Sequence, residues 1–504
     1  MNLKINGKIK PYYVQTLAMI FFPGAKFPEN EEVTPETVCA DLNLTEDEEG
    51  VSAHISIRQG DRTAEADSRA LWGEEKVLDP DRKRKIAAGD AFMKAGAAFT
   101  GFTPPWGILT GVRPAKVATE LLENGYSHEE AAELIHREYY VSPVKAKLAV
   151  DVAAAEAKVI TPEIRKECSV YIGIPFCPTR CAYCSFVSYT SPGLLRLIPE
   201  YLTALAQDID GIFSVIRELG KTVTSVYIGG GTPTILNPEQ LNFLLDQVTS
   251  HVSGLKEFTL EAGRPDTITP EKLTIAAAHG VDRMSVNTQT LNDEVLQKIG
   301  RAHDSAMFFR AYEAAKQSGI PHINVDLIAG LPYDTTDSFV DTIDRIIVLE
   351  PENITVHTFS VKKSSEFKAE GKFDPASQIA AESVAYSQTA LTAGGYLPYY
   401  MYRQKNTVGN LENVGYARPG HEGLYNIYMM EEVHSIFAAG ASSVTKLVSL
   451  PDAEGNMRIE RLFQPKYPYE YLGGEEKARE KLETLRKTSL VFFAEEASER
   501  KGSL

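Results

Sequence analysis

The sequence of 504 residues has only five cysteines, too few and odd in number for a framework of disulfides. It also has no excess of basic residues, because 52 Lys and Arg stand against 68 Asp and Glu and give a net charge of −16. This balance argues against an electrostatic surface for nucleic acid and, more weakly, against docking on anionic membranes. It leaves an acidic small substrate open, because local basic pockets survive on an acidic protein.

Long apolar runs are missing too, since no stretch approaches the ~20 apolar residues of a membrane span. The apolar stretch near the start is interrupted by Gln15, ends at Pro23 and precedes no small-residue cleavage site. We therefore expect a buried strand there, and a cytoplasmic protein without a membrane span. The 43% hydrophobic and 24% charged residues are typical of a soluble globular protein, and the length predicts two to four domains.

Three regions of different pattern divide the chain. Residues 1–165 combine strand-like runs with Ala- and Glu-rich helical stretches, and predict an α+β domain of unknown role. Within it, the Gly- and Pro-dense loop 101–116 carries Trp106 and Arg113. Residues 366–504 predict a mixed α/β extension, interpreted as a substrate-associated domain.

The middle region, residues 166–365, alternates short β-branched runs with longer helical stretches. Such alternation implies parallel strands joined by crossover helices. Six units are too few for a closed eight-stranded barrel, so we predict an α/β fold with a partial (β/α)6 barrel. The six runs are residues 169–175, 223–229, 257–262, 282–288, 322–329 and 353–360.

Three cysteines, Cys177, Cys181 and Cys184, follow the first of these runs with the spacing C-x3-C-x2-C. Thiolates are the natural ligands of iron–sulfur clusters, and three of them can hold three irons of a [4Fe-4S] cubane. The fourth iron then stays open to a small molecule. Zinc is the alternative, but it usually takes four protein ligands and the sequence has no second cysteine pair. We interpret Cys39 and Cys168 as ordinary buried thiols.

Polar and glycine residues stand at the ends of the predicted strands. Three glycines in YIGGGTPT let backbone approach a ligand, although the motif also fits a plain tight turn. In barrel-type folds the carboxyl ends of the strands hold the ligand site, although such polar residues can also cap a neighbouring helix. Arg301 fits a contact with a carboxylate, although a lone arginine is otherwise usually at the surface. The other residues in question are Gly230, Gly231, Thr232, Glu261, Gln289, Asp326 and Ser360.

The cysteine loop CPTRCAYC resembles the motif of the radical S-adenosylmethionine (SAM) superfamily. Over residues 165–450, the motif order YIGIPFCPTRCAYCSF, GGGTPT, TLEAGRPDT, SVNTQTLNDEVLQKIGRAH, NVDLIAGLP resembles the oxygen-independent coproporphyrinogen III oxidase (coproporphyrinogen dehydrogenase) family. The long amino-terminal extension resembles the oxidase-like subgroup of Gram-positive bacteria. The resemblance implies two cofactors, a [4Fe-4S] cluster on the three cysteines and SAM on its open iron, and a catalytic role for Tyr171. It implies SAM contacts for Tyr171, Tyr183, Gly230, Gly231, Thr232, Glu261, Gln289, Arg301, Asp326, Ser360 and Phe437.

The resemblance also implies a reaction. A 5′-deoxyadenosyl radical takes a β-hydrogen from a propionate, and loss of carbon dioxide and an electron leaves a vinyl group. Two propionates of coproporphyrinogen III react in this way and give protoporphyrinogen IX in anaerobic heme (porphyrin) biosynthesis. The expected partners are this tetrapyrrole and an unidentified electron donor. Candidate cations for its carboxylates are Arg113, Arg264, Arg403 and Arg418, and the aromatic stretch 396–402 fits either a flat pocket or core packing.

Two positions depart from the established oxidases, which have a further cysteine in place of Phe186 and a histidine in place of Gly173. The related heme chaperone also has Phe after its cysteines, and it carries heme without oxidising the precursor. A heme-binding, chaperone-like protein is therefore the alternative, with His421 and His434 as candidate axial ligands or, more ordinarily, structural histidines. A radical SAM enzyme acting on another substrate is a third hypothesis.

Overall fold

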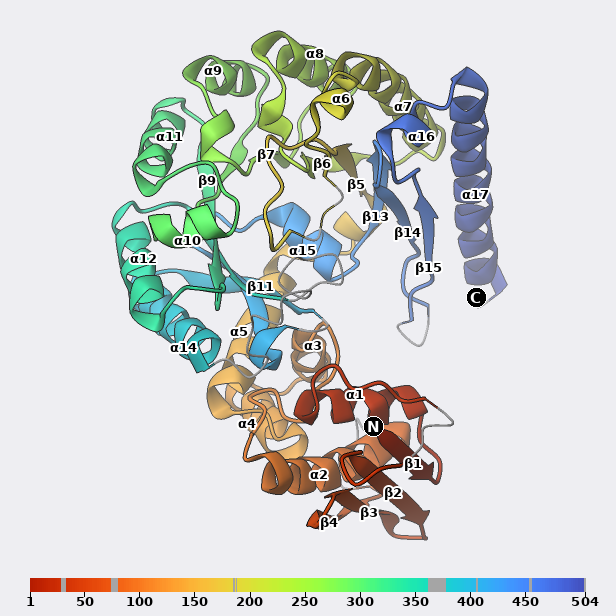
Figure 1. Ribbon diagram of the computed structural model, residues 1–504. Helices are drawn as coiled ribbons and strands as arrows, with labels where there is room; N and C mark the ends of the chain where they lie inside the picture. The colour runs from red at the N-terminus through yellow and green to blue at the C-terminus, as the bar shows by residue number, and fades with distance from the viewer. Residues whose placement is uncertain are drawn as a thin grey trace. The chain divides into compact units, whose positions relative to one another are not determined.

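The computed structural model describes residues 1–28, 33–73, 80–184, 186, 188–360, 378–404, 407–452 and 456–502 (Figure 1). The chain forms two compact units. The amino-terminal unit comprises Met1–Ala154, Asp374–Gln378 and Met401–Glu412. The core unit comprises Ala155–Phe373, Ile379–Tyr400 and Asn413–Leu504. The predicted domain boundaries near residues 165 and 365 stay predictions.

The amino-terminal unit has the predicted α+β composition. Its strands are β1 (Asn2–Asn6), β2 (Cys39–Glu46), β3 (Gly50–Gln59) and β4 (Arg62–Leu71). They form one sheet in this order, in which β1 and β2 are parallel and the other pairs are antiparallel. Helix α2 covers β3 and β4 and also packs on α1. The helices are α1 (Pro11–Phe21), α2 (Pro80–Thr100), α3 (Ala115–Glu123), α4 (His128–Tyr139) and α5 (Pro143–Val159), the last of which runs on into the core unit.

The apolar stretch near the start is helix α1, so the prediction of a buried strand there was wrong. Pro11 stands in the first turn, where the fixed φ of proline favours the start of a helix. The buried residues Val14, Leu17, Ala18 and Phe21 recur at intervals of three and four, which is the period of one helix face. The prediction weighed apolar content and overlooked this period.

Six parallel strands form the centre of the core unit and lie side by side in sequence order. They are β5 (Cys168–Ile174), β6 (Val223–Gly230), β7 (Glu257–Ala262), β8 (Arg283–Val286), β9 (His322–Ala329) and β10 (Asn353–Thr358). The crossover helices lie along the outer side of the curved sheet (Figure 1). They include α7 (Ile198–Glu218), α8 (Pro238–Thr249), α9 (Pro270–Ala278), α11 (Ser305–Gln317) and α12 (Thr336–Val348). The predicted α/β fold with a partial (β/α)6 barrel is confirmed.

Further strands extend this sheet at both edges. Next to β10 lie β12 (Glu412–Ala417) and then β11 (Leu397–Arg403), while next to β5 lie β13 (Ser435–Ala439), β14 (Val444–Val448) and β15 (Ile459–Phe463). In the described part of the chain no strand pairing joins β11 to β15, so the sheet does not close. Among the described residues, the remaining helices of at least six residues are α10 (Asp293–Lys298), α14 (Gln378–Ala393), α15 (Leu424–Met430) and α17 (Glu475–Gly502).

The inner face of the parallel sheet is polar, although strands covered on both faces usually carry continuous apolar runs. Tyr171 is in register with Tyr227, and Glu261 is in register with Ser285. The two side chains of each pair therefore point to the same face of the sheet. At the amino ends of the strands, the buried ion pair of Glu257 and Arg283 (3.0 Å) lies beneath helix α15. The polar groups nearer the carboxyl ends of the strands are the ones available for a functional site.

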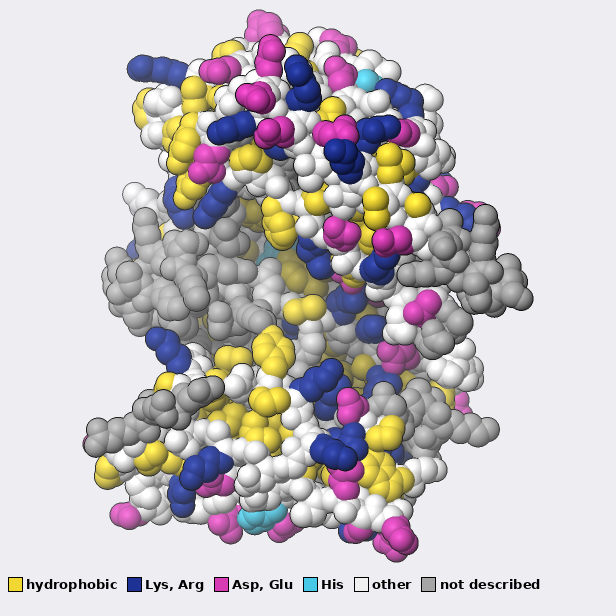
Figure 2. Space-filling model, turned by 90° about the vertical axis from the view of Figure 1, so that its right-hand side faces the viewer, with side chains coloured by type: hydrophobic (Ala, Val, Ile, Leu, Met, Phe, Trp, Pro, Cys, Tyr) yellow, Lys and Arg dark blue, Asp and Glu magenta, His cyan; other side chains and the backbone are white. Residues whose placement is uncertain are grey.

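Two surface properties bear on the predicted partners. No helix among the described residues is long and apolar enough to cross a membrane. Over the upper part of the face that Figure 2 shows, basic and acidic side chains are intermixed. The negative net charge is therefore not gathered there into one patch.

Candidate functional site

The three clustered cysteines lie on a loop that begins directly after β5. Backbone hydrogen bonds hold the base of the loop, because Cys177 N–H donates to the carbonyl of Tyr189 (3.1 Å) and Tyr189 N–H donates to that of Pro175 (2.9 Å). In the middle of the loop, Ala182 N–H donates to the carbonyl of Ile299 (3.0 Å), at the end of α10. The loop is thus fixed at the carboxyl end of the sheet.

The glycine-rich turn after β6 packs directly against this loop. Gly231 N–H donates to the carbonyl of Ile174 (2.7 Å), and Thr232 Oγ1 lies 3.3 Å from Cys177 Sγ. A Cβ at position 231 would lie 2.5 Å from the carbonyl oxygen of Phe176 and 3.0 Å from Cys177 Sγ. Only glycine allows this approach of the two segments.

The cysteine set fits an iron–sulfur cluster. Cys177 is buried and Cys181 and Cys184 are half-buried, and all three are free of disulfides. Burial and the charges of the other two cysteines raise the pKa of Cys184 to about 11, so three thiolates here need a cationic partner. No three His, Cys, Asp or Glu side chains in the described part of the chain converge on one ion. In a cubane each cysteine binds its own iron, so such convergence is not required.

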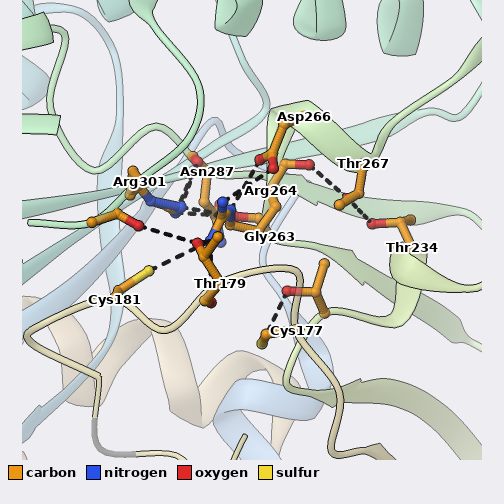
Figure 3. A network of polar contacts seen from close by, with 12 residues as sticks. Cys177, Thr179, Cys181, Thr234, Gly263, Arg264, Asp266, Thr267, Asn287 and Arg301 are labelled. Atoms are coloured by element: carbon orange, nitrogen blue, oxygen red, sulfur yellow. Dashed lines mark hydrogen bonds and ion pairs between the residues drawn. The ribbon is translucent and has the colours of Figure 1, made fainter. Parts of the chain in front are cut away.

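A buried arginine contacts the same loop from the end of β7 (Figure 3). Arg264, 3% exposed, donates from Nε and Nη2 to the two carboxylate oxygens of Asp266 at 2.9 and 3.0 Å. Its Nη1 donates to Thr179 Oγ1 (2.9 Å) and lies 3.7 Å from Cys181 Sγ. Burial alone would lower the pKa of Arg264, but Asp266 and the nearby cysteines raise it above its ordinary value. This candidate substrate anchor already has a carboxylate partner.

Arg301 lies beside this network and is also buried. Its Nη2 donates to the carbonyls of Gly263 (3.0 Å) and Asn287 (3.1 Å), so it joins the ends of β7 and β8 (Figure 3). Its Nε has no hydrogen-bond partner among the described residues. Tyr183 is close to Arg301: burial raises the pKa of this tyrosine, and the charge of Arg301 opposes the rise.

Three tyrosines stack along the inner face of the sheet. The ring centroids of Tyr171 and Tyr227 are 6.1 Å apart, and those of Tyr227 and Tyr425 are 4.7 Å apart. Burial, and then the charge of Glu261, raise the pKa of Tyr171 far above neutrality, so its phenol stays protonated. Aromatic side chains thus cover part of the inner face of these strands.

Two half-buried carboxyl groups, Glu261 and Asp326, lie near these tyrosines and differ in protonation. Burial, and then the charge of Asp326, raise the pKa of Glu261 from 4.5 to about 8. Burial would also raise the pKa of Asp326, but hydrogen bonds from His357 and Asn324 hold it below its ordinary value. Asn287 Nδ2 also donates to Asp326 (2.8 Å). Near neutral pH the site therefore contains a largely protonated Glu261 and an ionised Asp326.

The structure brings most of the predicted site residues to the carboxyl ends of the strands. Gln289, with a left-handed φ of 73°, joins β8 to β9 through its N–H to Asp326 O (3.0 Å). Ser360 follows β10 and is half-buried. Phe437 differs, because it is in register with Val170 and its side chain lies on the face of the sheet opposite Tyr171.

Several groups near the site were missed from the sequence. Asn287 and His357 both interact with Asp326 on the inner face. Asn287 stands two residues before Gln289, so the period of two could have found it, whereas His357 is three residues from Ser360 and gave no such signal. Thr179 and Asp266 gave no such signal, because their contacts with Arg264 depend on tertiary structure.

The candidate heme ligands and remaining cations have other partners. His434 is fully buried, and its two ring nitrogens lie 2.7 Å from Ser169 Oγ and 2.9 Å from Ile164 O. His421 Nδ1 lies 3.0 Å from His322 Nδ1. In the stretch 396–402, Tyr396, Tyr399, Tyr400 and Met401 are buried. Arg418 pairs with Glu350 (3.0 Å), Arg403 is buried in the amino-terminal unit against Asn410, and Arg113 is half-buried in that unit.

Comparisons with known proteins show what this chain is similar to. Residues 171–346 match the family model of the radical SAM superfamily. The oxygen-independent coproporphyrinogen-III oxidase-like protein HemZ of Bacillus subtilis (strain 168) is 33% identical over 91% of this chain and 92% of its own length. The heme chaperone HemW of the same organism is 33% identical over 54% of this chain and 70% of its own length. The solved structure of coproporphyrinogen III oxidase (HemN) from Escherichia coli has 26% identity and a TM-score of 0.46, and covers 58% of this chain and 67% of that one.

The similarity to the oxidase-like protein runs through nearly the whole of both chains, and the superfamily match spans the strands that carry the site. The cofactors of this superfamily, and of this protein, are a [4Fe-4S] cluster and SAM. The chain therefore belongs to the radical SAM superfamily and, within it, to the oxygen-independent coproporphyrinogen III oxidase-like family.

Proposed function

We propose that the protein is an oxygen-independent coproporphyrinogen III dehydrogenase of heme (porphyrin) biosynthesis. It would oxidatively decarboxylate two propionates of coproporphyrinogen III and release protoporphyrinogen IX. The observation that carries this proposal is the similarity to the oxidase-like protein over 91% of the chain, against 54% for the heme chaperone. Cytoplasmic location and the electron donor stay predictions from the sequence.

In this proposal Cys177, Cys181 and Cys184 would hold the cluster, and the glycine-rich turn of Gly230, Gly231 and Thr232 would lie beside it and contact SAM. The bound cofactors supply the electron and the 5′-deoxyadenosyl radical that removes a hydrogen from the substrate. Support comes from the close packing of this turn on Cys177: Thr232 Oγ1 lies 3.3 Å from Cys177 Sγ, and a Cβ at position 231 would lie 3.0 Å from the same sulfur. The chain positions the reacting groups and shields them.

The two inner-face carboxyl groups suit different parts of SAM. A protonated Glu261 can donate as well as accept a hydrogen bond, which suits a hydroxyl group, whereas an ionised Asp326 only accepts. We propose that both contact SAM, together with Tyr183, Gln289, Arg301, Ser360 and, less directly, Phe437. Tyr171 keeps its proton, stacks on Tyr227 and lies near the charge of Glu261, so we propose that it contacts the reacting atoms.

A heme-binding role is the second candidate, and the similarity to the heme chaperone favours it. Phe186, in place of the further cysteine of the oxidases, is 62% exposed on the cluster loop. The candidate ligand His434 argues against this role, because both of its ring nitrogens are engaged in hydrogen bonds within the core unit. Heme binding through His434 would have to break one of these hydrogen bonds inside the core unit, where the side chain is fully buried.

Anaerobic turnover tests the proposal directly. Reconstituted protein receives a chemical reductant, SAM and coproporphyrinogen III, and the products are followed by mass. Protoporphyrinogen IX with stoichiometric 5′-deoxyadenosine establishes the dehydrogenase, whereas cleavage of SAM without decarboxylation indicates another substrate. Tight heme binding with neither product would favour the chaperone. The Cys181→Ser variant should be inactive, and the Cys39→Ser variant, which changes a buried thiol of the amino-terminal unit, should keep full activity.

A further inference from the structure

Arg264 is buried more deeply than an anchor for a large carboxylate substrate needs to be. Its guanidinium is enclosed between Asp266, Thr179 and Cys181, and its side chain is 4% exposed. Burying a cation is costly unless it is paired, and Asp266 meets this need through two parallel hydrogen bonds. The remaining nitrogen, Nη1, is left to face the cysteine loop.

The orientation of this ion pair gives the sulfur of Cys181 a positive neighbour. Figure 3 shows Arg264 between Asp266 and Cys181. Its Nη1 lies 3.7 Å from Cys181 Sγ. Although the pair is neutral as a whole, its positive end is the one that meets the sulfur. Thr179 fixes this geometry, because its Oγ1 accepts from Nη1 (2.9 Å) and donates to the carbonyl of Gly300 (3.1 Å).

We propose that Arg264 is a positioning residue that raises the reduction potential of the cluster through its N–H···S contact with Cys181. One-electron reduction adds negative charge to the cluster and its thiolates, and hydrogen bonds to the sulfurs are among the features that set such potentials. Asp266 opposes the effect and thereby limits it. This inference rests on the proposed ligation by Cys181 and is independent of the substrate.

A redox titration of anaerobically reconstituted protein, without SAM or substrate, tests the inference. The reduced cluster is followed by electron paramagnetic resonance, with dithionite as reductant, in wild type and in Arg264→Gln, Arg264→Lys and Asp266→Asn variants. The matched control is Arg345→Gln, which removes the arginine of an exposed ion pair with Asp341 on α12. Only loaded molecules give the signal, so partial loss of cluster does not hide the result.

The two charge changes should act in opposite directions. At a fixed potential, Arg264→Gln should lower the ratio of reduced to oxidised cluster about tenfold, a shift of about −59 mV for one electron. Asp266→Asn should raise this ratio, Arg264→Lys should lower it less than the glutamine, and Arg345→Gln should leave it unchanged.

A ratio within twofold of wild type in Arg264→Gln, or a change of the same sign in Arg264→Gln and Asp266→Asn, would overturn the inference and leave Arg264 a structural residue. Loss of iron with an unchanged potential in the remaining cluster would have the same meaning. A wild-type protein that binds no cluster would instead refute the cysteine assignment itself.

Discussion

Replacing Gly231 by alanine should separate the cluster site from the rest of the fold. The new methyl group would lie 2.5 Å from the carbonyl oxygen of Phe176, 2.9 Å from that of Ile174 and 3.0 Å from Cys177 Sγ. Two of these three atoms belong to backbone, so a side-chain rotation cannot relieve the clash. The turn must instead move away from the cysteine loop, and the Gly231 N–H bond to Ile174 O (2.7 Å) must lengthen.

The expected cost follows from the kind of contact. Inserting a methyl group into a packed site without room usually costs about 1–3 kcal/mol, and here it also displaces a cluster ligand. We expect Gly231→Ala to lower the midpoint of thermal unfolding of the apoprotein and to leave well under half of the wild-type iron after reconstitution. Iron and sulfide per chain, with the absorbance of the cluster, provide the measurement.

A second glycine provides the control. Gly193, on the short helix α6 (Pro192–Leu195) of the core unit, has no atom within 4 Å of where a Cβ would stand, so Gly193→Ala should keep both stability and iron content. If Gly231→Ala binds iron as well as Gly193→Ala does and unfolds at the same temperature, the proposed packing of the glycine turn against Cys177 is refuted.

Three further predictions concern buried charge. Because the folded-state pKa of Glu261, about 8, exceeds its ordinary 4.5, folding takes up a proton between these values and stability falls as the pH rises from about 4.5 to 8. Glu261→Gln should therefore flatten the pH dependence of apoprotein unfolding in this window, and an unchanged profile would contradict the assignment. Glu257→Gln, on the same strand, should instead lower the free energy of unfolding by about 3–5 kcal/mol, because Arg283 loses its buried partner. An unfolding temperature of this variant equal to that of the wild type would contradict this prediction. In the amino-terminal unit, Lys145→Ala should cost about 3–5 kcal/mol, because it leaves the buried Glu412 without its ion pair. Its control, Lys147→Ala, breaks an exposed pair and should cost at most about 0.5 kcal/mol in the same denaturation experiment.

The sequence was most informative where a short pattern decides the structure. The six β-branched runs became the six parallel strands, because buried strands joined by helices leave a strong local signal. Helix α1 shows the limit of that reading: its apolar content suggested a strand, and only the spacing of Val14, Leu17 and Phe21 identifies a helix. Three cysteines in one loop were enough to predict the cluster, because their spacing and residue type carry the chemistry together.

Contacts between distant segments could not be predicted in the same way. Arg264 and Thr179 are 85 residues apart in the sequence, and nothing near either residue indicates that they meet. The addition of β13 to the edge of the sheet beside β5 joins residues more than 260 positions apart. That pairing also decides that Phe437 shares a face with Val170, which the sequence around Phe437 does not show.

Strand β7 shows how one element serves both stability and chemistry. Glu257 and Glu261 lie four residues apart, so alternation places both on the inner face of the sheet. Glu257 has a guanidinium at 3.0 Å and accepts the backbone N–H groups of Leu424 (2.7 Å) and Tyr425 (3.0 Å) at the start of α15. Both of its carboxylate oxygens therefore have hydrogen-bond partners, and Glu257 stabilises the amino end of the sheet. Glu261 has the carboxylate of Asp326 as its charged neighbour, and its ionised form is opposed. The same residue type is therefore structural at one end of the strand and able to exchange a proton near neutral pH at the other, where the cysteine loop lies.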